Sequence, residues 1–261
     1  MRPDYRPLIS VVMPSWNRDY TIQNSIRSIV DQTYDNWELV IVDDGSTDAT
    51  KKVVMNFANP KIKFIQLEHS GFISKVRNAG NALAKGEIIV VHDSDDQSFP
   101  DRLQSIVDAF AENPDADLVY HGMYQRFYDH YNNAIVRTPK EAVPFSKERL
   151  LREQYIPGQV AYKTSAILDT PYDERIKCCD DYQMLLEFCL KGKKFVPVFK
   201  NLYDYVNSPD SVNINGEIDG RRRKDVEVIL SILKEKYGVE ATAEMVRNTI
   251  GSEIVEINKV S

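Results

Sequence analysis

Three carboxylates crowd into four residues at Asp93, Asp95 and Asp96, directly after the apolar run EIIVVH. Carboxylates this close repel one another, so their pKa values rise unless a cation is present. Magnesium and manganese prefer oxygen ligands and bind through one or two carboxylates together with substrate phosphates. The cluster therefore indicates a divalent metal site, although acidic residues after a strand can also simply cap the next helix.

Two further pairs of aspartates lie at positions suited to chemistry. Asp43 and Asp44 follow the apolar run WELVIV, where a carboxylate can accept hydrogen bonds from a nucleobase or a ribose hydroxyl. The sequence DDGS also suits a simple turn and cap. Asp180 and Asp181 open a predicted helix that ends at Gly192. There they either complement the helix dipole or supply a general base whose pKa the neighbouring carboxylate raises.

The elements that must position these acids follow from the pattern of apolar residues. Continuous apolar runs suit strands buried on both faces, as in a parallel sheet. Strands that alternate with helices predict such a sheet with helices on both faces. Ligands on these sheets bind beyond the carboxyl ends of the strands, where the acidic clusters lie. The predicted strands are 8–13, 37–42, 62–67 and 87–92, and the predicted helices among them include 21–32 and 74–84.

The remainder of the chain is predicted to mix helices and strands. A basic run follows at its far end, and it suits either a solvated helix start or contact with an anionic lipid-linked partner or membrane surface. The run consists of Arg221, Arg222, Arg223 and Lys224. The predicted helices are 99–113, 149–155, 163–168, 181–192, 221–236 and 240–249, and the predicted strands are 116–120, 122–128 and 194–199.

Composition excludes several classes of protein. A formal net charge of −6 argues against general nucleic-acid binding, which needs a basic face. No stretch approaches the roughly 20 apolar residues of a spanning helix, and the N-terminus carries no signal-peptide run. Cys178, Cys179 and Cys189 form no CxxC pair, so we interpret them as reduced thiols of a cytoplasmic protein and not as metal ligands.

Taken together, the motifs resemble the inverting, SpsA-like enzymes of glycosyltransferase family 2, which have the GT-A fold. Four stretches carry the resemblance in the right order between Ile9 and Val198: ISVVMPSWNR, WELVIVDDGSTDAT, GFISKVRNAGNALAKGEIIVVHDSDD and YDERIKCCDDYQMLLEFCLKGKKFVPV. The resemblance implies an α/β fold with a mostly parallel central sheet flanked by helices. It implies a GT-A domain at 1–215, with a nucleotide-binding half at about 1–98 and an acceptor half at about 99–215. Residues 216–261 are expected to form a C-terminal helical appendage.

The resemblance also implies a nucleotide pocket. Asp43 is expected to read the base, most often uracil in this family, and Arg77 to contact the base or the diphosphate. Trp16 is expected to lie beside the base. The residues expected to line the pocket after the first strand are Pro14, Trp16, Asn17 and Arg18.

The acids have implied roles in the same scheme. Asp93 and Asp95 are expected to hold the ribose and the metal, with Asp96 as the main ligand of Mn²⁺ or Mg²⁺. Asp181 is expected to be the catalytic base, and Asp180 stands where the family commonly has Glu. A hydroxyl then displaces the nucleoside diphosphate directly, with inversion, so no covalent intermediate is needed.

One departure concerns the metal site. Many relatives carry a histidine in a YRxHxxS-like stretch, whereas this chain has Asn207 and Ser208 there. No QxxRW motif is present, which favours addition of a single sugar over polymerisation. The resemblance implies a nucleotide-sugar donor, with UDP preferred, and a saccharide or lipid-linked acceptor at the cytoplasmic side of the membrane.

Two other functions remain open at this stage. A sugar-phosphate nucleotidyltransferase should have a glycine-rich loop after the first strand, and PSWNRDY has no glycine. A non-catalytic binding protein on the same scaffold should have lost acids, but Asp96 and Asp181 are both present.

Overall fold

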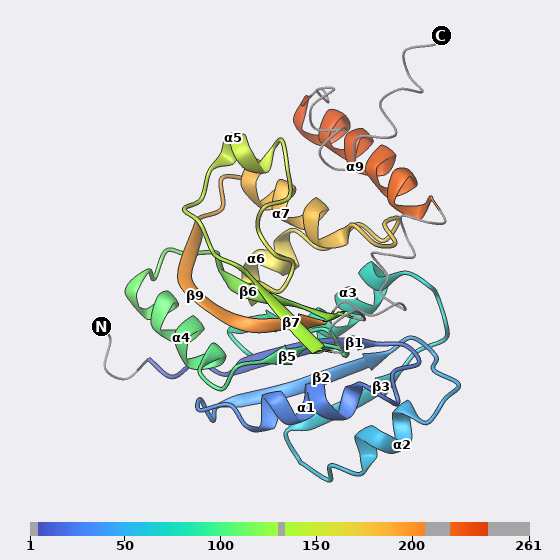
Figure 1. Ribbon diagram of the computed structural model, residues 1–261. Coiled ribbons are helices and arrows are strands. Elements are labelled where there is room, and N and C mark those ends of the chain that lie inside the picture. Colours follow the sequence, from blue (N-terminus) through green and yellow to red (C-terminus); the bar gives the residue numbers. More distant parts are fainter. Residues whose placement is uncertain (1–4, 130–133, 207–219, 240–261) are drawn as a thin grey trace.

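The computed structural model describes residues 5–129, 134–206 and 220–239 (Figure 1). Within these ranges one sheet of nine strands runs in the order β3-β2-β1-β4-β8-β6-β9-β5, with β7 paired to β6. The core of the sheet is formed by short apolar strands. Every residue of β1, β2 and β4 is buried.

The first half of the sheet is parallel, as its continuous apolar runs predict. β1 pairs in parallel with both β2 and β4, and β2 pairs in parallel with β3. Side chains of α1 and α2 pack on one face, and those of α3 pack on the other. The elements are β1 (Ile9–Ser15), α1 (Ile22–Val30), β2 (Trp37–Asp43), α2 (Thr50–Met55), β3 (Ile62–Gln66), α3 (Ile73–Leu83) and β4 (Ile88–Val91).

The second half of the sheet is mixed. β8 pairs antiparallel with β4 and β6, whereas β6 and β9 run parallel. Figure 1 shows the long β9 curling around this half of the molecule. The elements are β5 (Gln97–Ser98), α4 (Arg102–Glu112), β6 (Leu118–Asp129), β7 (Ala134–Lys140), α5 (Lys147–Leu150), β8 (Ala161–Lys163), α6 (Thr164–Asp169), α7 (Asp180–Leu190), β9 (Phe195–Val206) and α9 (Arg221–Tyr237).

Several helix and strand boundaries differ from those predicted from the sequence, and the pairing of strands in the sheet explains most of these differences. The two strands predicted at 116–120 and 122–128 are the single strand β6, whose register shifts at Gly122. A Cβ on Gly122 would lie 2.0 Å from Asn201 Oδ1 and 2.9 Å from the backbone oxygen of Lys140, so a side chain here would force both neighbours to shift. The helix predicted at 99–113 starts at Arg102, because Gln97–Ser98 pairs with β9 and the backbone N–H of Phe99 also donates to the backbone oxygen of Leu202 at 3.0 Å.

Two other predicted helices and one predicted strand have different ends in the structure. The helix predicted at 149–155 ends at Leu150, and the helix predicted at 163–168 starts at Thr164 because β8 precedes it. The strand predicted at 194–199 continues to Val206 along β6.

The helix α9 packs one apolar face against the rest of the protein. Its Ile229, Ile232 and Leu233 are buried in the same apolar cluster as Leu185 and Leu186 of α7. The helix predicted at 240–249 lies outside the described residues. Within the ranges that the structure describes, each helix is too short or too polar to cross a membrane.

Candidate active site

One cavity of about 560 Å³ lies at the carboxyl ends of β1, β2 and β4. Acids that follow separate strands meet in its wall, as parallel strand ends predict. The start of α7 and the end of β9 close the other side. The wall includes Pro14, Ser15, Trp16, Asn17, Arg18, Asp44, His69, Arg77, Asp93, Asp95, Gln159, Lys177, Cys178, Asp180, Asp181, Tyr205 and Arg221.

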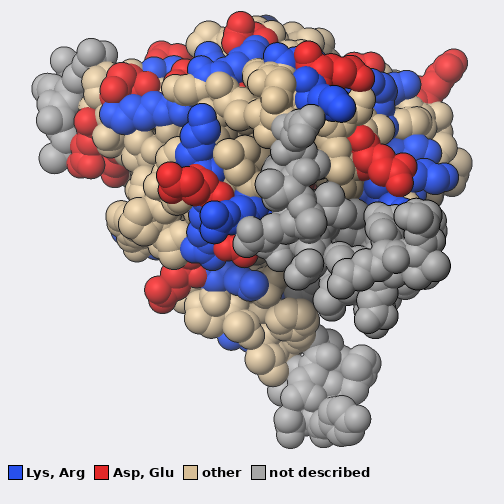
Figure 2. Space-filling view, turned by 90° about the horizontal axis from the view of Figure 1, so that it is seen from above, with Lys and Arg blue, Asp and Glu red and all other residues tan. Residues whose placement is uncertain are grey.

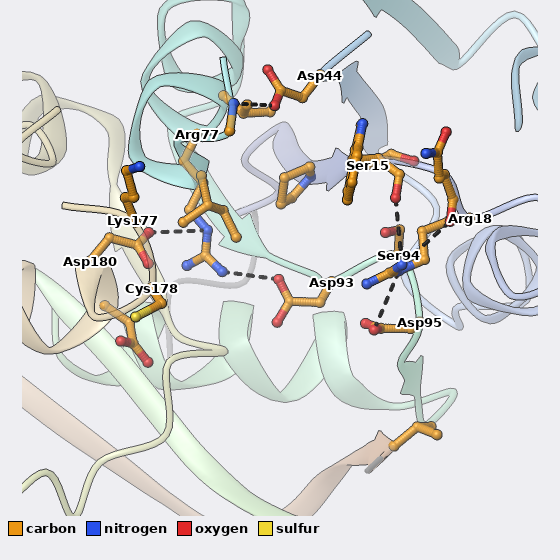
Figure 3. Close-up of a pocket in the computed structure, with 18 of the residues that line it drawn as sticks. Ser15, Arg18, Asp44, Arg77, Asp93, Ser94, Asp95, Lys177, Cys178 and Asp180 are labelled. Carbon is orange, nitrogen blue, oxygen red and sulfur yellow. Dashed lines mark hydrogen bonds and ion pairs between the residues drawn. The ribbon is translucent and has the colours of Figure 1, made fainter. Parts of the chain in front are cut away.

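The Arg77 guanidinium lies between two of these acids, as Figure 3 shows. It comes from α3 and is 5% exposed; its Nη2 donates to Asp93 Oδ1 at 3.0 Å, and its Nε lies 3.4 Å from Asp180 Oδ2. Burial lowers the pKa of Arg77, but Asp180 and Asp93 outweigh burial and hold that pKa well above its usual value. Nη1 is buried and finds no hydrogen-bond partner within the described part of the chain. A fixed cation with a spare donor in a cavity suits a phosphate group.

Asp93 and Asp95 are the members of the acidic cluster that line the cavity. Asp93 Oδ2 accepts a hydrogen bond from Gln159 Nε2 at 2.9 Å, and Asp95 Oδ2 lies 3.6 Å from Arg18 Nε. Burial and then the charge of Asp93 raise the pKa of Asp95 to about 6, against the opposing effect of Arg18. Crowded carboxylates with a raised pKa fit a site that accepts a divalent cation through oxygen ligands.

Asp96 is not among the residues that line the cavity, and its expected role as the main metal ligand stays a prediction. Its side chain is fully buried, and Oδ1 accepts a hydrogen bond from the backbone N–H of Val206 at 2.7 Å. Its backbone oxygen also accepts from Ser25 Oγ at 2.7 Å. Burial, followed by the charges of Asp95 and Asp93, raises the pKa of Asp96 well above its usual value. Asp96 therefore joins the turn after β4 to the end of β9, and Asp95 is the acid that a cation in the cavity can reach.

Asp43 is likewise turned away from the cavity. It is fully buried, and its Oδ2 accepts from the backbone N–H of Ser46 at 2.8 Å and from Gln66 Nε2 at 3.2 Å. Its neighbour Asp44 reaches the wall and accepts from the backbone N–H of Gly71 at 2.9 Å. The geometry thus gives no support to base reading by Asp43, which here holds the turn after β2.

An aromatic stack forms one end of the cavity. The indole of Trp16 is 48% exposed and stacks on the His69 imidazole, with ring centroids 4.9 Å apart and an angle of 17° between the planes. Such a face suits stacking by a nucleobase. His69 belongs to the EHSG sequence after β3, which carries no recognisable motif, so only the fold reveals its place.

The residues after β1 also make hydrogen bonds that hold the local backbone in place. Asn17 adopts a left-handed conformation with φ of 50° and accepts from the backbone N–H of Thr47 at 2.9 Å. The backbone N–H of Arg18 donates to Thr50 Oγ1 at 2.8 Å. These bonds join the loop after β1 to the loop after β2. Pro14, in β1, lines the cavity beside them.

The two acids that begin α7 differ in their surroundings. Asp180 is buried against Arg77, and burial raises its pKa while Arg77 opposes the rise. Asp181 is partly exposed to the cavity, and its Oδ2 accepts from Gln154 Nε2 at 2.7 Å. Gly158 makes room for it, because a Cβ there would lie 2.3 Å from Asp181 Oδ2. Asp181 is therefore the acid that an incoming molecule can meet.

Two cations extend the cavity beyond these acids. Lys177 precedes α7, and Arg221 begins α9. Arg221 thus belongs to the cavity, whereas Arg223 and Lys224 are exposed. On the face shown in Figure 2, acidic and basic side chains are interspersed among uncharged ones.

Comparison with known proteins gives a consistent answer. The family described as Glycosyl transferase family 2 matches residues 10–176. The beta-1,3-glucosyltransferase WfgD of Escherichia coli, named for UDP-Glc and alpha-D-GlcNAc-diphosphoundecaprenol, is 37% identical over 41% of this chain and 42% of its own length. The putative colanic acid biosynthesis glycosyl transferase WcaA of Escherichia coli K12 is 28% identical over 71% of this chain and 67% of its own length. The chain thus spans less than half of the first of these relatives.

Solved structures show the same architecture. Residues 1–349 of S. aureus TarS, in complex with UDP-GlcNAc, superpose with a TM-score of 0.68 at 19% identity, covering 93% of this chain and 71% of that one. PcManGT from Pyrobaculum calidifontis, in complex with GDP-Man and Mn²⁺, gives 0.66 at 21% identity, covering 95% and 69%. These likenesses confirm the expected GT-A fold.

Proposed function

Because the chain belongs to glycosyl transferase family 2, we propose that it transfers a single sugar from a nucleotide-sugar donor to an acceptor hydroxyl. One observation carries the proposal. The cavity is lined by a buried arginine with a spare donor, a carboxylate suited to a cation and a separate, partly exposed carboxylate: Arg77, Asp95 and Asp181. A sugar diphosphate needs the first two, and an attacking hydroxyl needs the third.

The base and the diphosphate of a nucleotide-sugar donor each have a matching side chain in the cavity. The exposed Trp16 face suits the base, and Arg77 suits the diphosphate. UDP is the preferred nucleotide, because a structural neighbour binds UDP-GlcNAc and the relative WfgD is named for UDP-Glc. The neighbour with GDP-Man makes guanosine the main alternative.

A divalent cation, Mn²⁺ or Mg²⁺, fits beside the diphosphate. Asp95 supplies a carboxylate oxygen in the cavity wall, and Asp93 stands close behind it, paired with Arg77. When bound, the metal neutralises the charge that develops on the leaving diphosphate. Mn²⁺ in two neighbouring structures supports this assignment. The position of the missing family histidine, at Asn207 and Ser208, lies outside the described residues.

Asp181 is the proposed general base. Its carboxylate is reachable from the cavity, whereas Asp180 is committed to Arg77. The hydroxyl loses its proton to Asp181 and attacks the anomeric carbon opposite the leaving group, so the configuration inverts. No covalent enzyme intermediate is required.

The acceptor is proposed to be a saccharide or a lipid-linked saccharide. Lys177 and Arg221 supply positive charge at the acceptor side of the cavity. The name of WfgD includes a diphosphoundecaprenol acceptor, and Lys177 and Arg221 suit such an anion. We extend the proposal to peripheral contact with the inner face of a membrane through Arg221, Arg222, Arg223 and Lys224.

A panel of nucleotide sugars with mass-spectrometric detection tests the function. We expect release of nucleoside diphosphate from one UDP-sugar, its loss in EDTA and its recovery with Mn²⁺. NMR of the product should show an anomeric configuration opposite to that of the donor. Donor binding in a thermal-shift titration without turnover of any sugar would instead indicate a non-catalytic binding protein.

The Mn²⁺ affinity of the nucleotide-free protein is expected to fall as the pH drops through 6. The pKa of Asp95 is raised to about 6 by burial and then by Asp93, and only the ionised carboxylate binds the cation. A single competing proton lowers the apparent affinity roughly tenfold per pH unit below that pKa and has little effect above it. Calorimetric titration across this range measures the effect. An affinity that stays constant to about pH 5 would contradict it.

A further inference from the structure

Asp225 of α9 reaches the turn that leads into the two acids of α7. It is 2% exposed. Its Oδ2 accepts from three successive backbone N–H groups, those of Lys177 at 3.0 Å, Cys178 at 2.6 Å and Cys179 at 3.0 Å, and Oδ1 also lies 3.0 Å from the first. Asp180 and Asp181 follow directly in the chain. One buried carboxylate thus holds the backbone just before both acids.

Local sequence supplies no substitute for this contact. The residue before α7, Cys179, makes no side-chain cap hydrogen bond. N–H groups at a helix start need partners, and unpaired buried donors are costly. Bonds from a charged acceptor are roughly twice as strong as neutral ones, and here several converge on one group. The conformation of the turn therefore depends on a residue more than forty positions away in the chain.

We propose that Asp225 is a positioning residue for sugar transfer. The turn 177–179 sets the direction in which α7 begins, and so it sets where Asp181 points. Lys177 and Cys178 of the same turn line the cavity. The inference rests on the proposed function, because it assigns Asp225 to the same site. It makes α9, which lies beyond the matched range 10–176, part of the catalytic framework.

A second explanation of the cluster is a metal site. Ligand atoms of Cys178, Cys179 and Asp225 lie within 4.8 Å of one another, and all three residues are buried. The two Sγ atoms are 3.9 Å apart. However, both Asp225 oxygens already accept backbone N–H groups, and a cation would have to displace those bonds. The hydrogen bonds therefore favour a positioning role for Asp225.

The other end of α9 offers a matched control. There Tyr237 Oη donates to Glu187 Oε2 of α7 at 2.7 Å, and Lys236 Nζ lies 3.1 Å from Glu187 Oε1. Tyr237→Phe removes one hydrogen bond between the same two helices without touching the turn 177–179. Any general effect of loosening α9 appears in both variants, whereas loss of positioning appears only at Asp225.

The test compares Asp225→Ala, Asp225→Asn and Tyr237→Phe with the wild-type chain, using the donor and metal found active in the panel. Asp225→Ala should lower kcat about 100-fold with little change in donor KM, since a displacement of about 1 Å at a reacting group costs this much. Asp225→Asn keeps one acceptor oxygen without the charge, so its kcat should be intermediate. Tyr237→Phe should keep the wild-type kcat. Hydrogen exchange of the peptide spanning 177–183 should accelerate only in the Asp225 variants.

The possible results distinguish a wrong role for Asp225 from a wrong proposed function. An active wild-type chain whose Asp225 variants keep kcat within about twofold of Tyr237→Phe would overturn the inference alone, because a displaced base costs far more. A wild-type chain that transfers no sugar would overturn the proposed function and the inference with it. If Asp225→Ala does not fold, the kcat of Asp225→Asn compared with that of Tyr237→Phe decides whether Asp225 has a positioning role. Loss of the Asp225→Asn phenotype on added Zn²⁺ would favour the metal-site explanation instead and would also overturn the inference.

Discussion

Asp181→Asn is expected to lower kcat about 10²–10⁴-fold, the range contributed by a positioned general base. The amide has nearly the same shape, so it should still accept the hydrogen bond that Gln154 Nε2 donates to Asp181 Oδ2. It cannot take a proton from the acceptor hydroxyl. Donor binding should be almost unchanged, because Arg77 and Asp95 are untouched. Single-turnover transfer and calorimetric titration with the donor nucleotide and Mn²⁺ measure the two effects separately.

The kinetics of Asp180→Asn should be compared with those of Asp181→Asn. Asp180 pairs with Arg77 Nε at 3.4 Å and is buried, so its loss changes the charge around the proposed diphosphate site. We expect donor KM and kcat to change together in Asp180→Asn, in contrast to the kcat effect alone in Asp181→Asn. A large rise in the donor dissociation constant of Asp181→Asn would remove the base role from that residue.

Asp95→Asn is expected to weaken Mn²⁺-dependent binding of the nucleoside diphosphate by more than about 100-fold. Changes to partners of metal ligands already cost about 10–100-fold, so loss of a direct ligand should exceed that range. Asp95 lines the cavity, and its carboxylate lies 3.6 Å from the Arg18 guanidinium, so a cation that binds there meets an ionised acid. Titration of the nucleotide with and without Mn²⁺ isolates the metal-dependent part.

Asp96→Asn is the paired variant, and the geometry predicts a different outcome for it. Its Oδ1 accepts from the backbone N–H of Val206, and an amide oxygen can do the same. Mn²⁺-dependent binding should therefore persist, with any change confined to the thermal unfolding midpoint. The reverse pattern, in which Asp96→Asn loses the metal effect and Asp95→Asn keeps it, would restore the assignment that the family resemblance implies.

Much of the site could be predicted because its residues follow strands. Continuous apolar runs identified β1, β2 and β4, and the ends of parallel strands necessarily share one edge of the sheet. Trp16 and the acidic cluster follow β1 and β4, so their convergence on one cavity was implicit in the order of the strands, whereas Arg77 of α3 and Asp181 of α7 were expected there from the family resemblance. Local chemistry also indicated a cation, because carboxylates so close in sequence cannot be far apart in space.

Tertiary packing decided which acid of each pair faces the cavity. Adjacent residues after a strand point in directions set by the turn that follows, and no spacing rule distinguishes Asp43 from Asp44 or Asp95 from Asp96. Hydrogen bonds from distant backbone and side chains, at Gln66 and at Val206, turn one member of each pair inward. The same long-range packing brings Gln159 to Asp93.

The fold class, the edge of the sheet that holds the site and the chemical types that gather there could all be predicted from the order of residues along the chain. The apolar pattern and the succession of helices and strands are properties of short segments, so they can be recognised along the chain. The packing of one face of α9 against α7 and the hydrogen bonds between Asp225 and the turn before α7 became visible only in the folded chain. Such contacts join segments far apart in the chain, and their partners carry no local pattern that would reveal the pairing.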